Sequence, residues 1–179
     1  MEARRYKGHW EIDTVHGRGR HHCIVTLLER KTGFVMIGKL PDKSTASLNK
    51  KTLRLIGRDP LSFKTITADN GTEFHQYKKI EARCRTKFYF ANPYHSWERG
   101  SNENVNGLIR QYLPKIESMA NLTQQRCHQI ADKYCRSSNL ILGYSYHESV
   151  STVIPSVLVK LNRTLFVETF QSELATHHR

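Results

Sequence analysis

The order of strand-like and helix-like segments constrains the fold of this chain most. Residues 9–15, HWEIDTV, alternate with period two, which is typical of a strand and places Asp13 in its middle, on the face opposite Trp10 and Ile12. Segments 21–30 and 34–40, joined by a turn at KTG, have the pattern of a β-hairpin. Three strands therefore come first, and their short connections predict antiparallel pairing.

Helices and strands then alternate along the chain. Segment 42–58 predicts a helix capped by Ser44 or Thr45 and stopped by Gly57. The later segments are predicted as strand 63–68, helix 72–84, strand 87–91, helix 101–113 with Ser101 as its cap, and helix 122–139 starting at Thr123. This order predicts an α/β protein with a ribonuclease-H-like fold, in which helices flank a mixed five-stranded sheet.

Charge points to a polyanionic partner. The 179 residues include 28 Lys and Arg against 16 Asp and Glu, a formal charge of +12, as expected of a protein that meets nucleic acid; a basic surface with no specific partner is the alternative. The length and the 38% apolar content favour one domain. The four cysteines lack zinc-site or redox spacing, and no apolar run approaches the roughly 20 residues of a membrane span, so we expect a soluble intracellular protein.

The stretch TADNGTEF places Asp69 at the end of a predicted strand. Ligands gather outside strand ends in sheets with parallel inner strands. If this strand pairs beside the first, Asp13 and Asp69 converge, and a divalent cation would relieve their repulsion. Asn70-Gly71 is expected to form a tight left-handed turn that aims the Asp69 side chain outward. The alternative is that Asp69 only caps this turn.

Four glutamates after Asp69 compete to complete such a site. Glu73 and Glu81 fall in the predicted helix 72–84, which should carry them away along the flank of the sheet, and Glu98 falls in a loop. Glu103 falls in the first turn of its predicted helix, where the helix dipole favours the ionised carboxylate. Glu103 is therefore the predicted third acid.

Three stretches, GHWEIDTV, TADNGTEF and YFANPYHSWERGSNENVNGLIRQYLPK, resemble the DDE transposases and retroviral integrases, and within them the insertion-sequence-thirty family of bacterial transposases. The resemblance implies that Asp13, Asp69 and Glu103 are the catalytic, metal-binding acids. It also implies two Mg²⁺ ions, about 3.5 to 4 Å apart, for which Mn²⁺ can substitute. The implied reaction is cleavage at transposon ends followed by attack of the 3′-hydroxyl on target DNA.

The implied partners are transposon-end and target DNA and further copies of the chain on that DNA, with no membrane and no small-molecule cofactor. In a bacterium the protein would be cytoplasmic and associated with the nucleoid. Candidate DNA-contacting residues near the third acid are His95, Trp97, Arg99, Asn102, Asn106, Arg110 and Lys115. Trp97 is equally expected as a core residue, and the polar helix residues of this set as a solvated face.

Two other groups of side chains have open interpretations. A basic helix face suits either phosphate contact or plain solvation, and it consists of Lys50, Lys51, Arg54 and Arg58. The histidines His16, His21 and His22 fall at irregular spacing in a predicted turn, so we expect them on the surface and not at a metal.

The expected organisation is a catalytic core over residues 1–150 and a helical tail of unknown role over 151–179. Family members usually carry an upstream helix-turn-helix region, and this chain starts almost at the first catalytic strand, which suggests a catalytic-domain fragment or a natural truncation. Two alternative functions stay open. One is a non-catalytic DNA-binding or regulatory derivative, and the other is a metal-dependent nuclease of the ribonuclease H type.

Overall fold

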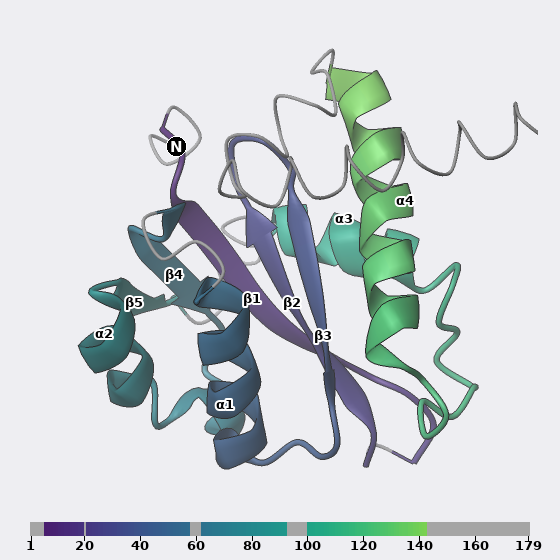
Figure 1. The fold of residues 1–179 in the computed structure, drawn as a ribbon, viewed down its shortest axis with the longest axis horizontal. Helices are drawn as coiled ribbons and strands as arrows, with labels where there is room; N and C mark the ends of the chain where they lie inside the picture. The colour runs from purple at the N-terminus through teal and green to yellow at the C-terminus, as the bar shows by residue number, and fades with distance from the viewer. Residues whose placement is uncertain (1–5, 20, 58–61, 93–99, 143–179) are drawn as a thin grey trace, which may run out of the picture.

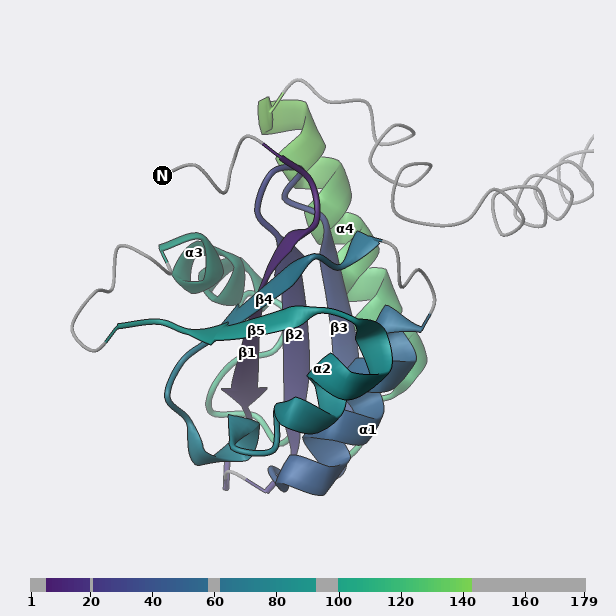
Figure 2. The same cartoon turned by 90° about the vertical axis from the view of Figure 1, so that its left-hand side faces the viewer.

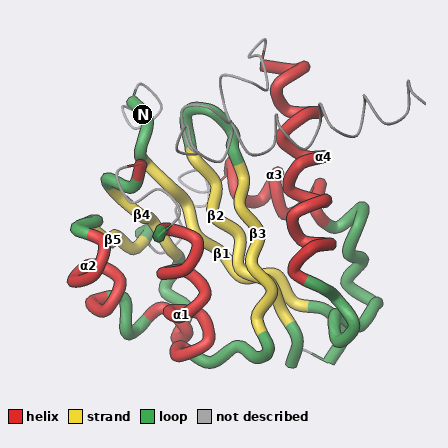
Figure 3. Tube along the Cα trace, viewed as in Figure 1, coloured by secondary structure: helices red, strands yellow, loops and turns green. Residues whose placement is uncertain are grey.

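The computed structural model describes residues 6–19, 21–57, 62–92 and 100–142. Helices lie on both sides of a central sheet (Figures 1 and 3). The strands are β1 (His9–His16), β2 (Cys23–Glu29), β3 (Val35–Leu40), β4 (Thr65–Ala68) and β5 (Lys87–Phe90). The helices are α1 (Thr45–Ile56), the 3-10 helix η3 (Thr72–Phe74), α2 (Lys78–Cys84), α3 (Gly100–Ile109) and α4 (Gln124–Leu142). None of the helices in these ranges is long and apolar enough to span a membrane.

The five strands form one mixed sheet in the order β3-β2-β1-β4-β5. The first three strands pair antiparallel, and β4 and β5 add to β1 in parallel. At the β5 edge, the Glu81 carboxylate accepts a hydrogen bond from the Phe88 backbone N–H at 2.8 Å, which satisfies a donor that an edge strand would otherwise expose. The predicted mixed five-stranded sheet is confirmed.

Each face of the sheet carries its own core. One face packs against α1 and α2, where Trp10 stacks on Phe63 at a centroid distance of 4.2 Å. The opposite face packs against α3 and α4, whose buried residues include Val105 and Ile130. Figure 2 shows α3 on one side of the sheet and α1 with α2 on the other. Because side chains alternate along β1, Ile12 and Asp13 point into these two different layers.

Helix boundaries agree with the sequence in part. Ser44 caps α1 through its side chain, which accepts from the Ser47 N–H, and Gly57 ends it. Thr123 caps α4 by accepting from the Arg126 N–H at 3.1 Å; α4 extends to Leu142, past the predicted end at residue 139.

Two predicted helices differ from the structure. The helix expected over 72–84 is split, because successive i→i+3 hydrogen bonds wind residues 71–77 too tightly for an α-helix. The helix expected over 101–113 already begins at Gly100, so the prediction of Ser101 as its cap is wrong. It ends at Ile109, ahead of Pro114, which disfavours helical backbone in the residue before it. The tail 151–179 lies outside the described residues.

Candidate active site

Asp13 and Asp69 belong to neighbouring segments of the sheet, because Asp13 lies on β1 and Asp69 directly follows β4. The parallel register of β1 and β4 pairs Glu11 with Thr67. Asp13 and Asp69 come two residues later on the same two segments, and Asp13 faces α3 through Asn106. The parallel pairing of the two strands that the convergence requires is therefore present, and the convergence itself stays a prediction.

The Asp13 carboxylate is held from two directions. Its Oδ2 accepts a hydrogen bond from Asn106 Nδ2 on α3 at 2.8 Å, and its Oδ1 accepts from the Thr14 backbone N–H at 2.8 Å. The side chain thus joins the middle of the sheet to the helix above it. A carboxylate with two fixed acceptor contacts has little rotamer freedom, which suits a metal ligand.

Asp69 does cap the turn that follows it. Its Oδ1 accepts from the Gly71 backbone N–H at 2.9 Å, and Asn70 Nδ2 donates to the Ala91 carbonyl at 3.2 Å. The prediction that Asp69 caps this turn is therefore confirmed. It is compatible with metal binding, since a carboxylate has about four lone-pair sites.

Gly71 has a different role from the one the sequence suggested. Its φ of −63° and ψ of 140° are ordinary extended backbone, so the prediction of a left-handed turn is wrong. Glycine is needed there for space. A Cβ at this position would lie 2.6 Å from Glu73 Oε2 and 2.8 Å from Asp69 Oδ1. The two carboxylates therefore leave no room for a side chain at position 71.

Glu103 is exposed in the first turn of α3, as predicted. It shares a helix face with Asn106, one turn later, which contacts Asp13. Over the ranges that the structure describes, no three His, Cys, Asp or Glu side chains form a group that could hold a metal. Asp13 thus lies on β1, Asp69 directly follows β4, and Glu103 lies on α3, the helix that contacts Asp13 through Asn106.

The remaining candidates for DNA contact have varied positions. Asn102 is only 1% exposed. Arg110 is half-buried, and its Nη1 donates to the His16 carbonyl at 2.7 Å, so it fastens the end of α3 to the end of β1; burial lowers the pKa of its guanidinium. Lys115 is exposed. The other three candidates, His95, Trp97 and Arg99, lie outside the described residues.

Glu73 is the site residue that sequence reasoning missed. It was expected to be carried away along the flank of the sheet, and this is wrong, because η3 folds it back against β1. Glu73 Oε1 accepts from Thr14 Oγ1 at 2.8 Å and forms an ion pair with Lys43 Nζ at 3.1 Å. The signal was present in the sequence: a chain that breaks at Asn-Gly directly after a strand can return to that strand within a few residues.

Electrostatics at this end of β1 favour a charged glutamate and a neutral histidine. Burial would raise the pKa of Glu73, but hydrogen bonds from its own backbone N–H, Thr14 and Lys43, together with the Lys43 charge, lower it overall. Burial lowers the pKa of His16, and Lys43 and Arg110 lower it further. His16 is half-buried, whereas His21 is exposed as expected.

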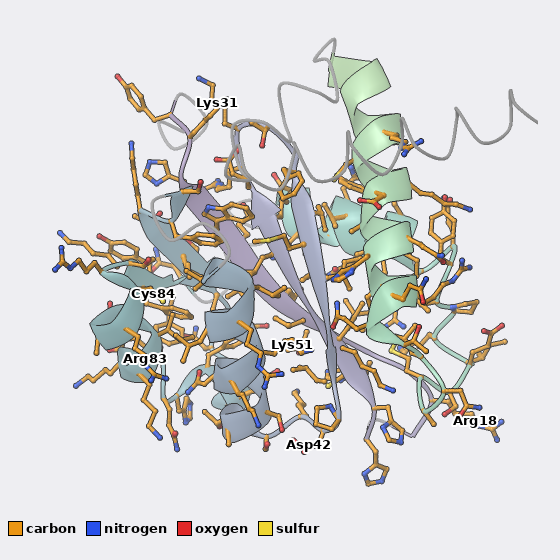
Figure 4. All side chains as sticks on the ribbon, viewed as in Figure 1. Arg18, Lys31, Asp42, Lys51, Arg83 and Cys84 are labelled. Atoms are coloured by element: carbon orange, nitrogen blue, oxygen red, sulfur yellow. The ribbon has the colours of Figure 1, made fainter. Side chains whose placement is uncertain are left out.

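The basic residues of α1 divide into two groups. Lys50 and Arg54 are exposed. Lys51 points the other way: its stem fills the space above Gly38 of β3, and its Nζ donates to Gln124 Oε1 at 3.0 Å (Figure 4). Lys51 therefore joins α1 to α4, and Lys50 and Arg54 remain exposed on the predicted basic face. The fourth member of that face, Arg58, lies outside the described residues.

Comparison with known families identifies the type of protein. The integrase core domain model matches residues 3–96. The chain belongs to the integrase core domain family. It is 40% identical over 144 residues to the transposase for insertion sequence element IS4351 of Bacteroides fragilis, a match that covers 80% of this chain and 44% of that protein. It is 37% identical over 132 residues to transposase InsI for insertion sequence element IS30A of Escherichia coli K12, covering 73% and 34%.

Solved structures confirm the ribonuclease-H-like fold of this integrase core. The catalytic core domain of BIV integrase superposes with a TM-score of 0.56 at 18% identity, covering 90% of this chain and 99% of that one. A simian T-cell lymphotropic virus intasome structure gives a TM-score of 0.55 at 16% identity, covering 70% of this chain and 46% of that one.

The transposase relatives confirm the resemblance to the insertion-sequence-thirty family that the sequence motifs indicated. This chain spans less than half the length of the two transposases that it matches.

Proposed function

We propose that this chain is the catalytic core of a transposase that cleaves DNA at transposon ends and joins the new 3′-hydroxyl to target DNA. The observation that carries the proposal is the parallel pairing of β1, which carries Asp13, with β4, which Asp69 follows, in an integrase core whose relatives are transposases. Residues 1–150 would form this core, with residues 151–179 as a separate tail.

The donor set fits a hard divalent cation. Carboxylate oxygens are the ligands that Mg²⁺ and Mn²⁺ prefer, and carboxylates that converge on one point repel each other without a cation. Asp13, Asp69 and Glu103 would hold two Mg²⁺ ions, or Mn²⁺ in their place. Bound there, the ions would activate the attacking oxygen and stabilise the leaving 3′-oxygen of an in-line displacement at phosphorus.

The contribution of the protein is to position these groups. Asn106 holds the Asp13 carboxylate and the Gly71 N–H holds that of Asp69. Glu103, in the first turn of α3, lies where the helix dipole favours its ionised form. Arg110 fixes the other end of α3 to β1. Because Asn106 and Arg110 both bind β1, α3 would hold Glu103 at a fixed distance from that strand.

The proposed partner is DNA, because a formal charge of +12 favours phosphate contact and counterion release. Transposon ends and target must be brought together in one complex, so we propose that several copies of the chain assemble on DNA. Binding by this core alone would be largely independent of sequence, with its strength set by salt.

The test is a metal-dependent nicking and strand-transfer assay on a pre-cut or flanked transposon end, with an end-recognition domain added if the chain alone is inert. Glu103→Gln should abolish cleavage and joining while the fold and salt-sensitive DNA binding stay intact. Glu117→Gln, an exposed glutamate past the end of α3, is the matched control. Glu98→Gln tests whether Glu98 could be the third acid in place of Glu103, and we expect it to lower activity only slightly.

Three outcomes would count against the proposal. If Glu103→Gln keeps wild-type turnover while Glu98→Gln loses activity, the third acid is Glu98 and not Glu103. Absence of any metal-dependent cleavage by the wild-type protein fused to an end-recognition domain would favour a non-catalytic DNA-binding derivative. Cleavage of DNA–RNA hybrids without strand transfer would favour a nuclease.

A further inference from the structure

Glu73 is a buried carboxylate to which the proposed reaction assigns no role. It is 6% exposed and lies on η3, in the layer of α1 and α2, on the opposite face of the sheet from Asp13. Burying a charged side chain costs free energy unless it is paired and hydrogen-bonded. A glutamate placed there needs compensating contacts, and these contacts lead to both aspartates of the candidate active site.

The first contact leads to Asp13. Thr14 lies between the two carboxylates: its hydroxyl donates to Glu73 Oε1 at 2.8 Å on one side, and its backbone N–H donates to Asp13 Oδ1 at 2.8 Å. Lys43 Nζ, 3.1 Å from the same Glu73 oxygen, keeps Glu73 charged and in place. Fixing the Thr14 side chain therefore fixes the peptide group that orients Asp13.

The second contact leads to Asp69. Glu73 Oε2 lies 2.6 Å from the point where a Gly71 Cβ would be, and Asp69 Oδ1 lies 2.8 Å from the same point. The Gly71 N–H donates to Asp69 Oδ1 at 2.9 Å. Glu73 thus packs directly on the residue that holds the Asp69 carboxylate.

The two oxygens of Glu73 differ in a way that supports this arrangement. Oε1 accepts from Thr14 and pairs with Lys43, whereas Oε2 faces Gly71. One carboxylate therefore contacts both segments that hold the aspartates, Thr14 of β1 through Oε1 and the turn at Gly71 through Oε2.

We propose that Glu73 is the positioning residue of the candidate active site, holding Thr14 and Gly71 so that the carboxylates of Asp13 and Asp69 keep the spacing that one divalent ion requires. The proposal rests on the metal site proposed above for these two aspartates. Glu73 acts through its neighbours and does not touch the ion. Outer contacts of this kind typically change metal affinity by about 10- to 100-fold when removed.

The main experiment is a Mn²⁺ titration of the full chain followed by electron paramagnetic resonance, with circular dichroism to confirm folding. Glu73→Ala and Thr14→Val should each weaken Mn²⁺ binding by about 10-fold or more. The two effects should not add in the double variant, because both remove the same contact. Glu73→Gln keeps an oxygen that accepts from Thr14 and should retain most of the affinity.

The matched control is Glu81→Ala. Glu81 is another partly buried glutamate of the same segment, bound to the Phe88 N–H at the edge strand and turned away from both aspartates. It should leave Mn²⁺ affinity unchanged. Equal losses in Glu81→Ala and Glu73→Ala would show general loosening of the fold. An equal loss in Glu73→Gln and Glu73→Ala would show that the Glu73 charge acts directly on the ion. Either result would overturn the positioning role.

A second readout separates this inference from the proposed metal site. Hydrogen exchange of the Gly71 amide, measured without metal, should become about tenfold faster in Glu73→Ala, since its acceptor Asp69 would lose its support. If wild type binds no Mn²⁺ but this exchange responds, the metal site is wrong and the positioning contact stands. Unchanged exchange and wild-type Mn²⁺ affinity in a folded Glu73→Ala would refute the inference. If Glu73→Ala does not fold, the same measurements on Thr14→Val decide.

Discussion

Asn106 on α3 donates a hydrogen bond of 2.8 Å to Oδ2 of Asp13 in the middle of β1. This is the contact by which the helix carrying Glu103 meets the strand carrying the first acid. Residues 93 positions apart in sequence thereby set the distance between two proposed metal ligands. The helix is positioned by polar pairing at the site itself as well as by its buried residues Val105 and Ile109.

Replacing Asn106 with alanine should therefore weaken both the fold and the site. Loss of a hydrogen bond to a charged acceptor should lower the free energy of unfolding by about 1.5–3 kcal/mol. Urea denaturation measures this loss. Asn104→Ala, at an exposed position of the same helix, is the control and should be close to neutral. Equal effects of the two substitutions would mean that the contact contributes nothing beyond helix propensity.

Gly71 and Gly107 should respond to alanine with opposite signs. At Gly71 the added methyl meets two carboxylate oxygens within 3 Å, so Gly71→Ala should destabilise by about 1–3 kcal/mol and disturb Asp69. At Gly107, in α3, nothing lies within 4 Å of the added Cβ, so Gly107→Ala should stabilise by about 0.5–1 kcal/mol. Thermal unfolding of the two variants tests this, and destabilisation by Gly107→Ala would contradict it.

The sheet was predictable because period-two alternation is a local signal that does not depend on tertiary contacts. The same alternation placed Asp13 on the face of β1 that meets α3, and the parallel pairing of β4 with β1 places the segment of Asp69 next to that strand. Glu103 in the first turn of its helix was predictable for a similar reason, since the segment that follows Gly100 has clear helical character.

The Asn-Gly break showed that the chain could turn back after β4, but it could not by itself place Glu73, because the position of this residue depends on contacts between distant segments. Helix propensity favoured one continuous helix over 72–84, and tertiary contacts with Thr14 and Lys43 override it. Gly71 was misjudged in a related way. Asn-Gly usually indicates positive φ, but here glycine is required by two side chains that only the folded structure brings near it.

Substitution of two lysines can show which layer of the protein contacts DNA. Asp13 and α3 belong to one layer of the sheet, whereas Lys50 lies on α1 in the other. Lys115→Gln should reduce the slope of log K against log salt by about 0.9 on duplex DNA, the contribution of one phosphate. Lys50→Gln should leave the slope unchanged. The reverse result would place the DNA along α1.

Stability should fall as pH falls through the range in which His16 titrates. Burial first, then the charges of Lys43 and Arg110, hold the pKa of His16 below its ordinary value of 6.5, against the opposing effect of Glu73 and Asp13. Between its pKa in the folded protein and 6.5, the unfolded chain binds more protons than the folded one. The free energy of unfolding therefore decreases as pH is lowered through this window.

Removing the imidazole should remove that part of the pH dependence. When pH is lowered from about 7.5 to about 5.5, the melting temperature of His16→Gln should fall by less than that of the wild type. This holds even if the variant is less stable at the higher pH. His75→Gln is the control for removing an imidazole at an exposed position. Melting curves of the three proteins at the same ionic strength provide the measurement. A His16→Gln protein with the full wild-type loss would show that other groups cause the pH dependence, and that His16 is as well solvated in the folded protein as in the unfolded chain.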